Sequence, residues 1–310
     1  MTTNFYEDYR FPDLDWSLGK KRVALVRQSS IRPAALVFSR NLATANEMLL
    51  LPLVVSADNA HKMEFVPYIL SARLPFVGRF NDPDAIEDLQ KAEKGAHETF
   101  HKDVDLDKVL GTAISNFQRL RQRWTFESSL RSLLLSGVLA VWTAFECLAA
   151  DMWVAALNER LFPFGADALS AVSPSDAEHG ISGKHVSVGL LRKYGFDLRD
   201  KMGNALRSKF DFTGVSDVKK AYSAAFGHAD VLASILGSQK LSELEATRHL
   251  IVHRAAIVDE DYKNRVDCNL TVENPLPLSG ITAAPLISAG IQCGCDLIAF
   301  ADDAIGNAQA

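Results

Sequence analysis

A long apolar stretch, SLLLSGVLAVWTAFECLAADMWVAAL, runs from Ser132 to Leu157 and constrains the fold more than any other feature of the sequence. Its length is that of a membrane-spanning helix. Glu146 would then lie near the bilayer centre, where a charged side chain costs about 2.5–3.5 kcal/mol, and Asp151 follows closely. A helix packed among other helices explains the stretch better. We therefore expect a core or dimer-interface helix of a helical bundle, and no membrane span.

The composition is that of an ordinary globular protein. The chain has 310 residues, of which 48% are hydrophobic and 23% charged, and its net charge is −5. This length allows one large domain or two modest ones, and the acidic balance restricts any nucleic-acid contact to a local surface. The cysteines show no disulfide framework, and the acidic, aromatic N-terminus does not have the pattern of a signal peptide. We expect reduced thiols and a cytoplasmic location.

Residues 1–110 predict an N-terminal region of mixed α+β structure and of no recognised type. KRVALVRQSS, residues 21–30, is typical of a short strand that ends in a polar turn. The next stretch has apolar residues at helical spacing until Pro52 interrupts it, and further prolines indicate short elements and loops. A highly charged segment over about residues 81–108 predicts a solvated helix that acts as a connector.

Residues 111–310 predict a helical domain that follows the N-terminal region. Short helices are expected at VSVGLLRKYGFDL (186–198) and DVKKAYSAAFG (217–227). Longer ones are expected at QKLSELEATRHLIVHR (239–254) and PLISAGIQCGCDLIAFADDAIG (285–306). The predicted fold class is therefore mainly α, with a smaller α+β region at the N-terminus.

The segment RHLIVHRAAIVDEDY, residues 248–262, sets basic side chains in an apolar run at the end of a predicted helix. Arg248 and His253 are five positions apart, which on a regular helix separates them by about 140°. One interpretation is an arginine bonding the last carbonyls and a histidine complementing the helix dipole. Another is a zinc site, because Glu245, His249 and His253 share one helix face. No second ligand cluster is obvious, and the residues alone leave a structural, a metal-binding and a catalytic role open.

The longer stretch ATRHLIVHRAAIVDEDY resembles the signature of HEPN domains, in particular of the RiboL-PSP-type branch. That signature has an arginine, a polar residue, an apolar stretch and a histidine, then small residues and a Val-Asp pair with an acidic and aromatic end. The wider pattern is also similar over about residues 117–303, with an apolar helix carrying an internal glutamate before the motif and an apolar helix after it. Ala255 and Ala256 depart from the pattern, because such proteins often have asparagine or glycine there.

The resemblance implies a dimeric bundle of four or five helices in which the R-x4-H motifs of two subunits meet in one cleft. It implies metal-independent RNA cleavage without a cofactor, often by toxins or phage-defence effectors. Carried onto this chain, Arg248 and His253 are the catalytic candidates, and His249 orients the site. The expected partners are an RNA substrate, a second copy of the chain, and an antitoxin or defence-system protein. A non-catalytic dimeric interaction or nucleotide-binding module is the alternative.

The residue types suit this chemistry. Attack by an RNA 2′-OH needs a proton acceptor, and an imidazole with an ordinary pKa of about 6.5 can accept or donate protons near neutrality. Arginine stays cationic and matches phosphate oxygens with two N–H groups. Glu146 also belongs to the candidate site, because a glutamate in an apolar helix needs a buried partner, and Arg248 or His249 would serve.

A basic segment offers a candidate RNA-binding surface. Between Lys184 and Lys220 there are nine lysines and arginines against four aspartates, a local charge of +5 in a chain of net charge −5. Arg192 and Lys193 could contact phosphates, and Tyr194 could stack on a base. A solvated helical face with core aromatic residues remains the alternative interpretation.

Overall fold

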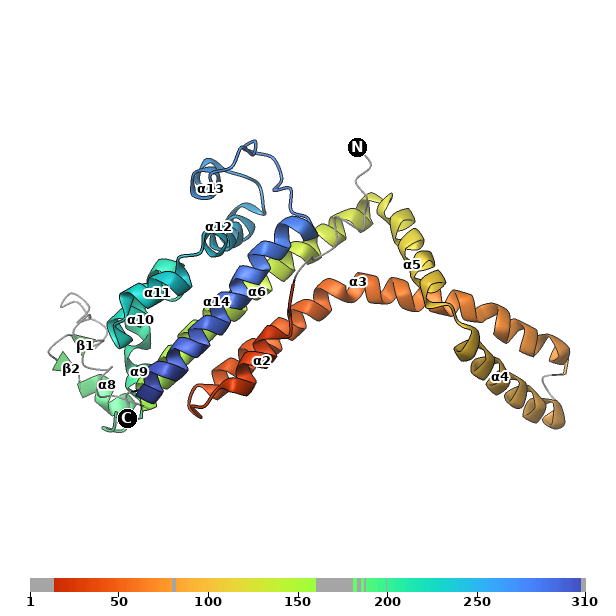
Figure 1. The fold of residues 1–310 in the computed structure, drawn as a ribbon, viewed down its shortest axis with the longest axis horizontal. Helices are drawn as coiled ribbons and strands as arrows, with labels where there is room; N and C mark the ends of the chain where they lie inside the picture. Colours follow the sequence, from red (N-terminus) through yellow and green to blue (C-terminus); the bar gives the residue numbers. More distant parts are fainter. Residues whose placement is uncertain are drawn as a thin grey trace. The chain divides into compact units, whose positions relative to one another are not determined.

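The computed structural model describes residues 14–79, 82–159, 181–182, 185–186, 188–198 and 200–307, and most of them are helical (Figure 1). The mainly α class predicted from the sequence is confirmed. The α-helices are α2 (Leu18–Leu25), α3 (Arg32–Arg73), α4 (Pro83–Asp103), α5 (Leu106–Arg121), α6 (Trp124–Glu159), α8 (Val188–Lys193), α9 (Met202–Leu206), α10 (Val215–Phe226), α11 (Ala229–Leu236), α12 (Gln239–Arg254), α13 (Glu260–Val266) and α14 (Gly280–Asn307). Short 3-10 helices lie at η1 (Leu74–Phe76) and η4 (Arg207–Lys209), and β1 (Ile181–Ser182) pairs antiparallel with β2 (His185–Val186).

The chain divides into two compact units that interleave along the sequence. Among the described residues, unit 1 comprises those between 48 and 132, and it holds most of α3 together with α4 and α5. Unit 2 comprises residues 14–47 and the described residues between 133 and 307, and it holds α2, the first turns of α3, most of α6, and α8 to α14. This division differs from the ranges 1–110 and 111–310 predicted from the sequence, because each unit takes segments from both.

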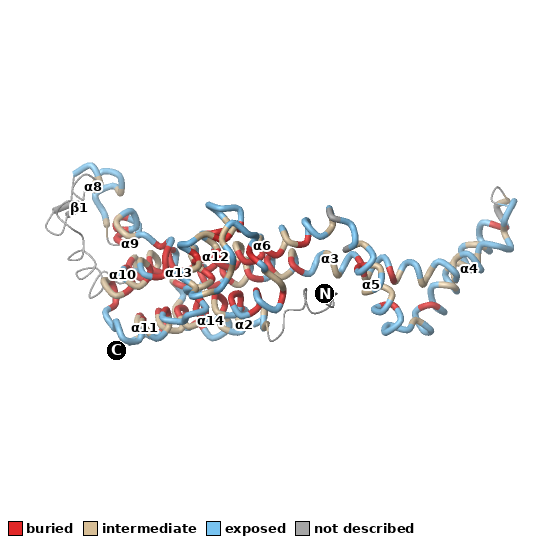
Figure 2. Tube along the Cα trace, turned by 90° about the horizontal axis from the view of Figure 1, so that it is seen from above, coloured by how far each residue is buried: buried red, intermediate tan, exposed pale blue. Residues whose placement is uncertain are grey.

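Helix α14 lies at the centre of the core of unit 2. A Cβ atom at Gly290 would lie 2.9 Å from the side chains of both Val141 in α6 and Leu244 in α12. At Gly294 a Cβ atom would overlap the ring of Phe38 in α3. Three helices therefore pack directly against the backbone of α14, and side chains there would disturb close packing. Figure 2 shows buried residues concentrated along α6, α12 and α14.

Two buried aromatic side chains tie α6 to α10. The indole N–H of Trp153 donates to the carbonyl of Ala221 over 2.9 Å, and the hydroxyl of Tyr222 donates to the carbonyl of Ala149 over 2.8 Å. Both rings are completely buried, and burial raises the pKa of Tyr222 well above its usual value. Each polar atom thus finds a backbone partner across the helix–helix contact, as buried polar groups require. The apolar stretch of α6 forms core within unit 2.

Within the part of the chain that the structure describes, two helices are long and apolar enough to cross a membrane by length and composition alone. They cover Thr125–Glu159 and Gly280–Asn307. Just over half of each apolar window is buried inside the protein, at 56% and 61% respectively. Core helices of helical bundles have the same length and composition, so this property alone is weak evidence for a membrane span.

The strand predicted at residues 21–30 is wrong. Helix α2 covers Leu18–Leu25, and the described parts of residues 1–110 contain helices and turns but no strand. A contact with a distant helix explains the difference. Asp302 of α14 accepts hydrogen bonds from the backbone N–H groups of Arg27 and Gln28, just after α2. These bonds hold α2 along α14, and that contact overrides the strand propensity of the short Val-Ala-Leu-Val run. The expected N-terminal α+β region is therefore not shown.

Unit 1 is built from long helices that pack through few buried residues. Phe100 of α4 is buried against Phe65 and Tyr68 of α3, with ring centroids 5.1 Å and 5.3 Å apart. The hydroxyl of Ser56 donates to the carbonyl of Ala113 in α5 over 2.9 Å. The charged helix predicted over about residues 81–108 exists as α4, which begins at Pro83 after an Asp82 cap. It packs on α3 instead of serving as an isolated connector.

The helix break expected at Pro52 is also wrong. Helix α3 continues through both Pro52 and Pro67 and ends at Arg73. Proline in a helix interior removes one backbone hydrogen bond and costs about 3 kcal/mol. Contacts of α3 with α4 and α5 on one side compensate for this loss within unit 1.

Candidate functional site

The predicted motif lies at the C-terminal end of α12, where the helix stops abruptly. Ala255 and Ala256 both have positive φ angles, of 51° and 61°. The carbonyl of Leu250 accepts hydrogen bonds from the N–H groups of both alanines. The left-handed backbone reverses the chain direction and satisfies a terminal carbonyl, as helix C-caps commonly do. The helix stays regular through His253 and does not loosen there.

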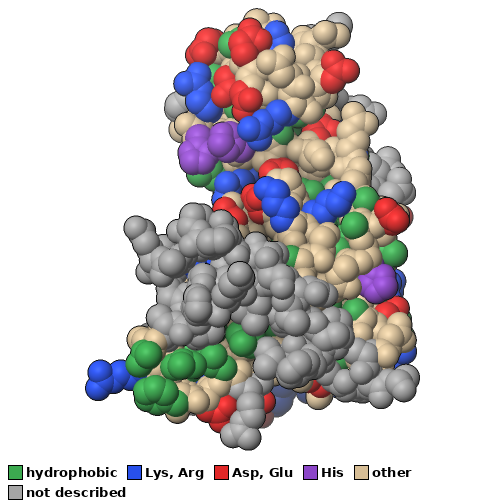
Figure 3. All heavy atoms as spheres, turned by 90° about the vertical axis from the view of Figure 1, so that its left-hand side faces the viewer, with side chains coloured by type: hydrophobic (Ala, Val, Ile, Leu, Met, Phe, Trp, Pro, Cys, Tyr) green, Lys and Arg blue, Asp and Glu red, His purple; other side chains and the backbone are tan. Residues whose placement is uncertain are grey.

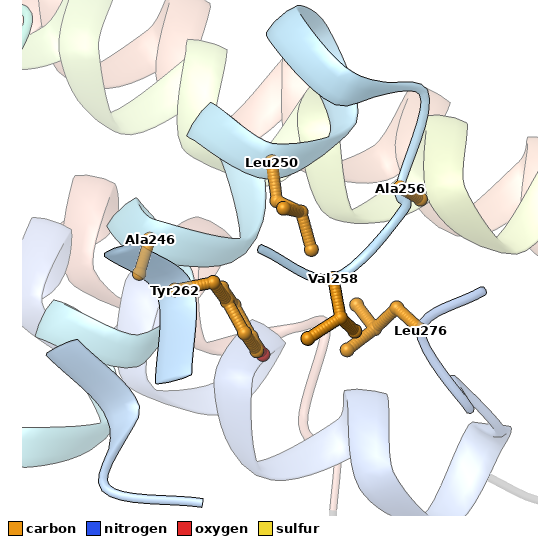
Figure 4. Packing of buried hydrophobic residues seen from close by; sticks show 6 residues of the cluster. All are labelled: Ala246, Leu250, Ala256, Val258, Tyr262 and Leu276. Atoms are coloured by element: carbon orange, nitrogen blue, oxygen red, sulfur yellow. The ribbon is translucent and has the colours of Figure 1, made fainter. Parts of the chain in front are cut away.

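The Val-Asp-Glu-Asp-Tyr end of the motif is explained by packing. Asp259 caps α13 by accepting from the N–H of Tyr262 over 2.8 Å. Val258 is buried in a cluster with Leu250 and Leu276, drawn in Figure 4. The hydroxyl of Tyr262 lies 3.2 Å from the hydroxyl of Thr247, which is fully buried. This part of the motif therefore fixes the turn from α12 to α13.

Arg248 points away from this cluster and toward α6. Its guanidinium lies 3.9 Å from the carboxylate of Glu146, and the two side chains are 25% and 21% exposed. Burial raises the pKa of Glu146, and the charge of Arg248 opposes that rise. The buried indole N–H of Trp142, one turn earlier on α6, forms no hydrogen bond of normal geometry but also favours the carboxylate. Of the two partners that the sequence suggested for Glu146, Arg248 is the one that lies beside it, and it is only partly buried.

Two further charged residues near Glu146 were not among the predicted site residues. Asp211 raises the pKa of Glu146, and Arg207 lowers it. Both belong to the segment between α9 and α10, where the Arg207 guanidinium lies 4.5 Å from the centre of the buried Phe212 ring. In the sequence, Arg207 is only one of the nine basic residues between Lys184 and Lys220, and nothing local connects it to α6.

The two histidines of α12 form a separate exposed pair. The ring centroids of His249 and His253 lie 4.5 Å apart and the rings are tilted by 46°. Their four-residue spacing places them on one face of the helix. The side chains of the motif are therefore arranged as two pairs, Arg248 with Glu146 and His249 with His253.

The zinc interpretation loses its third ligand. The carboxylate of Glu245 accepts a hydrogen bond from the N–H of Val215 at the start of α10, and burial raises its pKa. A Cβ at Gly214 would lie 3.0 Å from a Glu245 oxygen, which shows how closely this carboxylate approaches the α10 N-terminus. Across the described residues, no group of three or more histidine, cysteine, aspartate or glutamate side chains could hold a metal ion.

The candidate RNA-binding residues lie apart from α12. Arg192, Lys193 and Tyr194 belong to α8 and the turn after it, and Figures 1 and 2 place α8 away from α12 within unit 2. The Lys193 ammonium lies 5.4 Å from the centre of the Tyr194 ring. Lys184 and Arg199, two other cations of this segment, lie outside the described residues. On the face in Figure 3, the described basic side chains lie among acidic ones and do not merge into one surface.

No family model matches the chain, and neither a curated protein nor a solved structure matches it. The resemblance to HEPN domains therefore rests on the sequence pattern alone. Chemically, the site combines a half-buried guanidinium, 3.9 Å from a carboxylate, with two exposed imidazoles on the same helix.

Proposed function

We propose that this protein is a metal-independent endoribonuclease of the HEPN type, a toxin or phage-defence effector that acts as a dimer. The observation that carries the proposal is the pairing of Arg248 with Glu146 beside an exposed pair of imidazoles. The carboxylate attracts the guanidinium across 3.9 Å and favours its orientation before substrate arrives, which lowers the cost of ordering it. The exposed imidazoles remain free to reach a substrate.

The arrangement suggests a division of roles in RNA cleavage. A neutral His253 accepts the proton of the 2′-OH as its oxygen attacks phosphorus, and the bond from phosphorus to the 5′-oxygen breaks. His249, in its protonated form, donates a proton to the departing 5′-oxygen. Arg248 stabilises the charge that builds on the phosphate oxygens. The products are a 2′,3′-cyclic phosphate and a 5′-hydroxyl, and no water or metal enters this step.

The rival proposal is a non-catalytic interaction module, and one observation favours it. Arg248 already has an internal partner in Glu146, and the Val-Asp end of the motif is satisfied by packing around Val258 and Asp259. A motif retained for structure would have these contacts. The two proposals differ in whether His253 is needed for any reaction.

The test is incubation of the purified full chain with a labelled RNA oligonucleotide, with and without EDTA. We expect cleavage that survives chelation, 2′,3′-cyclic phosphate ends, and no cleavage where the 2′-OH is replaced by hydrogen. His253→Ala should reduce the rate by about 10²–10⁴-fold. His101→Ala, which removes an exposed histidine from α4, is the matched control and should leave the rate unchanged.

Two outcomes would contradict the proposal. Activity that is lost in EDTA and restored by zinc would favour the metal interpretation of His249 and His253. Absence of cleavage by a folded chain, or wild-type cleavage by His253→Ala, would favour the interaction module.

A further inference from the structure

Helix α3 carries a row of exposed apolar side chains within unit 1. Leu51, Val55, Met63, Val66 and Leu70 are each between 49% and 60% exposed. Their spacings of four, eight, three and four residues place them on one face of a helix. We call these five residues the α3 stripe. Five large apolar side chains in line on a water-exposed helix are not expected without a partner.

The opposite face of α3 is already occupied, so the stripe is not the core side of the helix. Ala60 is completely buried beside Val109 and Ala113 of α5. Phe65 packs on Phe100 of α4. Helix α3 thus has one face against α4 and α5 and a second apolar face directed outward.

The exposed apolar area of the stripe is large enough to form part of a protein–protein interface. Leu74 and Val77, just beyond the end of α3, are 73% and 66% exposed and extend the apolar surface. Together these side chains expose several hundred Å², and the largest apolar patch on a typical monomer is about 300–600 Å². A stable interface buries about 800 Å² per partner. Polar residues flanking the stripe would supply the remainder.

The order of residues along the stripe is nearly the same in both directions. Leucine stands at positions 51 and 70, valine at 55 and 66, and the midpoint lies between Ala60 and His61. Consider two identical helices that pack antiparallel about a two-fold axis at that midpoint. Each residue then faces the residue equally far from the midpoint on the other helix, so the numbers of the two facing positions always sum to 121. Leu51 of one copy then meets Leu70 of the other, and Val55 meets Val66. An isologous contact needs this self-complementarity.

The charges beside the stripe are compatible with that pairing. Asp58 and Lys62 form an ion pair within α3, with 2.6 Å between the ammonium and the carboxylate. In the antiparallel arrangement Asn59 of one copy faces Lys62 of the other, and Asp58 faces Met63. No like charges therefore face each other between positions 51 and 70.

We propose that the α3 stripe is a dimerisation surface, on which α3 of a second copy of this chain packs antiparallel with Val55 opposite Val66. The contact belongs to unit 1 and uses none of the residues of the candidate active site. Its test is the association of the full chain, so failure of this contact is distinguishable from failure of the proposed ribonuclease activity, whose test is RNA cleavage.

The proposal predicts a charge-reversal pattern in the mass of the full chain, measured by sedimentation equilibrium from about 1 to 100 μM. The wild type is a dimer. Val55→Glu and Val66→Lys, each alone, place a charge against a valine twice per dimer, and each weakens association by at least about a hundredfold. The double variant Val55→Glu/Val66→Lys restores the dimer, because the introduced carboxylate of one copy then faces the introduced ammonium of the other. The two substituted positions are too far apart on one helix, at about 16 Å, to pair within a chain.

A matched control and three results decide the outcome. Val231→Glu changes a valine of α11 with the same 49% exposure as Val66 and should leave the dimer intact. Circular dichroism verifies that each variant is folded. A monomeric wild type, a single variant that associates normally, or a double variant that stays monomeric would each overturn the proposal. A wild-type monomer that sediments with phosphatidylcholine–phosphatidylglycerol vesicles would instead assign the stripe to a membrane surface.

Discussion

Ala255 and Ala256 show how single residues shape the end of the candidate active site. Both adopt left-handed backbone angles, which cost a non-glycine residue about 1 kcal/mol. Ala256 is fully buried and its methyl group packs with Leu250 and Val258, whereas Ala255 is exposed. Both positions therefore carry backbone strain, but only at the exposed Ala255 can glycine relieve it without removing a buried methyl group.

Ala255→Gly should stabilise the protein by about 0.5–1 kcal/mol, because it relieves the left-handed strain without loss of a buried contact. Ala256→Gly is the matched comparison and should give no gain, since it deletes a buried methyl group worth about 0.8 kcal/mol. Urea unfolding of both variants measures the difference. No gain from Ala255→Gly would contradict strain at position 255, and equal gains from both substitutions would show that the buried methyl group of Ala256 contributes little to stability.

Glu146 should make stability depend on pH in a definite direction. Burial is the main cause of its raised pKa, so the folded protein binds a proton at Glu146 at a higher pH than the unfolded chain does. Its contribution to stability is therefore fully present below the ordinary carboxyl pKa of 4.5 and is lost as the pH rises through the folded-state pKa.

Glu146→Gln removes this titration. Relative to the wild type, the variant should become progressively more stable as the pH rises from about 4.5 to neutrality, because the penalty on the buried carboxylate is absent. The measurement is the difference in the free energy of unfolding between the two proteins across that range. A difference that stays constant, or that shifts toward the wild type with rising pH, would contradict the account.

At the scale of elements, Asp302 clamps the segment after α2 onto α14. Its buried carboxylate accepts from the backbone N–H groups of Arg27 and Gln28 over 2.9 Å and 2.8 Å, and from the Arg27 side chain over 2.8 Å. Asp303, the next residue, also pairs with Arg27, but its side chain is 67% exposed. The two neighbours thus contact the same arginine from very different environments.

Asp302→Ala should destabilise the protein by about 2–4 kcal/mol, because it leaves two backbone donors without their acceptor and removes a buried charge partner. Asp303→Ala should cost less than about 1 kcal/mol, as exposed ion pairs generally do. Thermal unfolding of the two variants compares them directly. Similar losses for both would mean that the charge of Arg27 matters more than the backbone bonds.

The elements that sequence patterns predicted well are those with strong local signals. The helix predicted at residues 239–254 coincides with α12, and the C-terminal helix is found as α14. The helix predicted at residues 217–227 is found as α10, which starts two residues earlier and ends at Phe226. The local sequence predicted that the helix would end at Pro52, but α3 continues past this proline because it packs against other helices.

At the scale of the whole molecule, the interleaving of the two units could not be predicted from composition. Segments on either side of residues 48–132 belong to one unit, and only long-range contacts such as Gly294 with Phe38 reveal this. The arrangement of the candidate site could likewise be predicted only in part from the sequence. A buried partner for Glu146 was expected, but the sequence offered both Arg248 and His249, and the role of Arg207 depends on a contact between distant segments.

The central claim is that Arg248 acts as a phosphate clamp and not as a structural cation. It is tested most directly by the single-turnover rate of RNA cleavage for Arg248→Lys. Lysine keeps the charge but loses the planar pair of N–H groups, so the account predicts a fall of at least about a hundredfold. Arg254→Lys, at the end of the same helix where Arg254 bonds Glu273 over 2.9 Å, is the control and should cleave at the wild-type rate. Cleavage by Arg248→Lys at the wild-type rate would contradict the account.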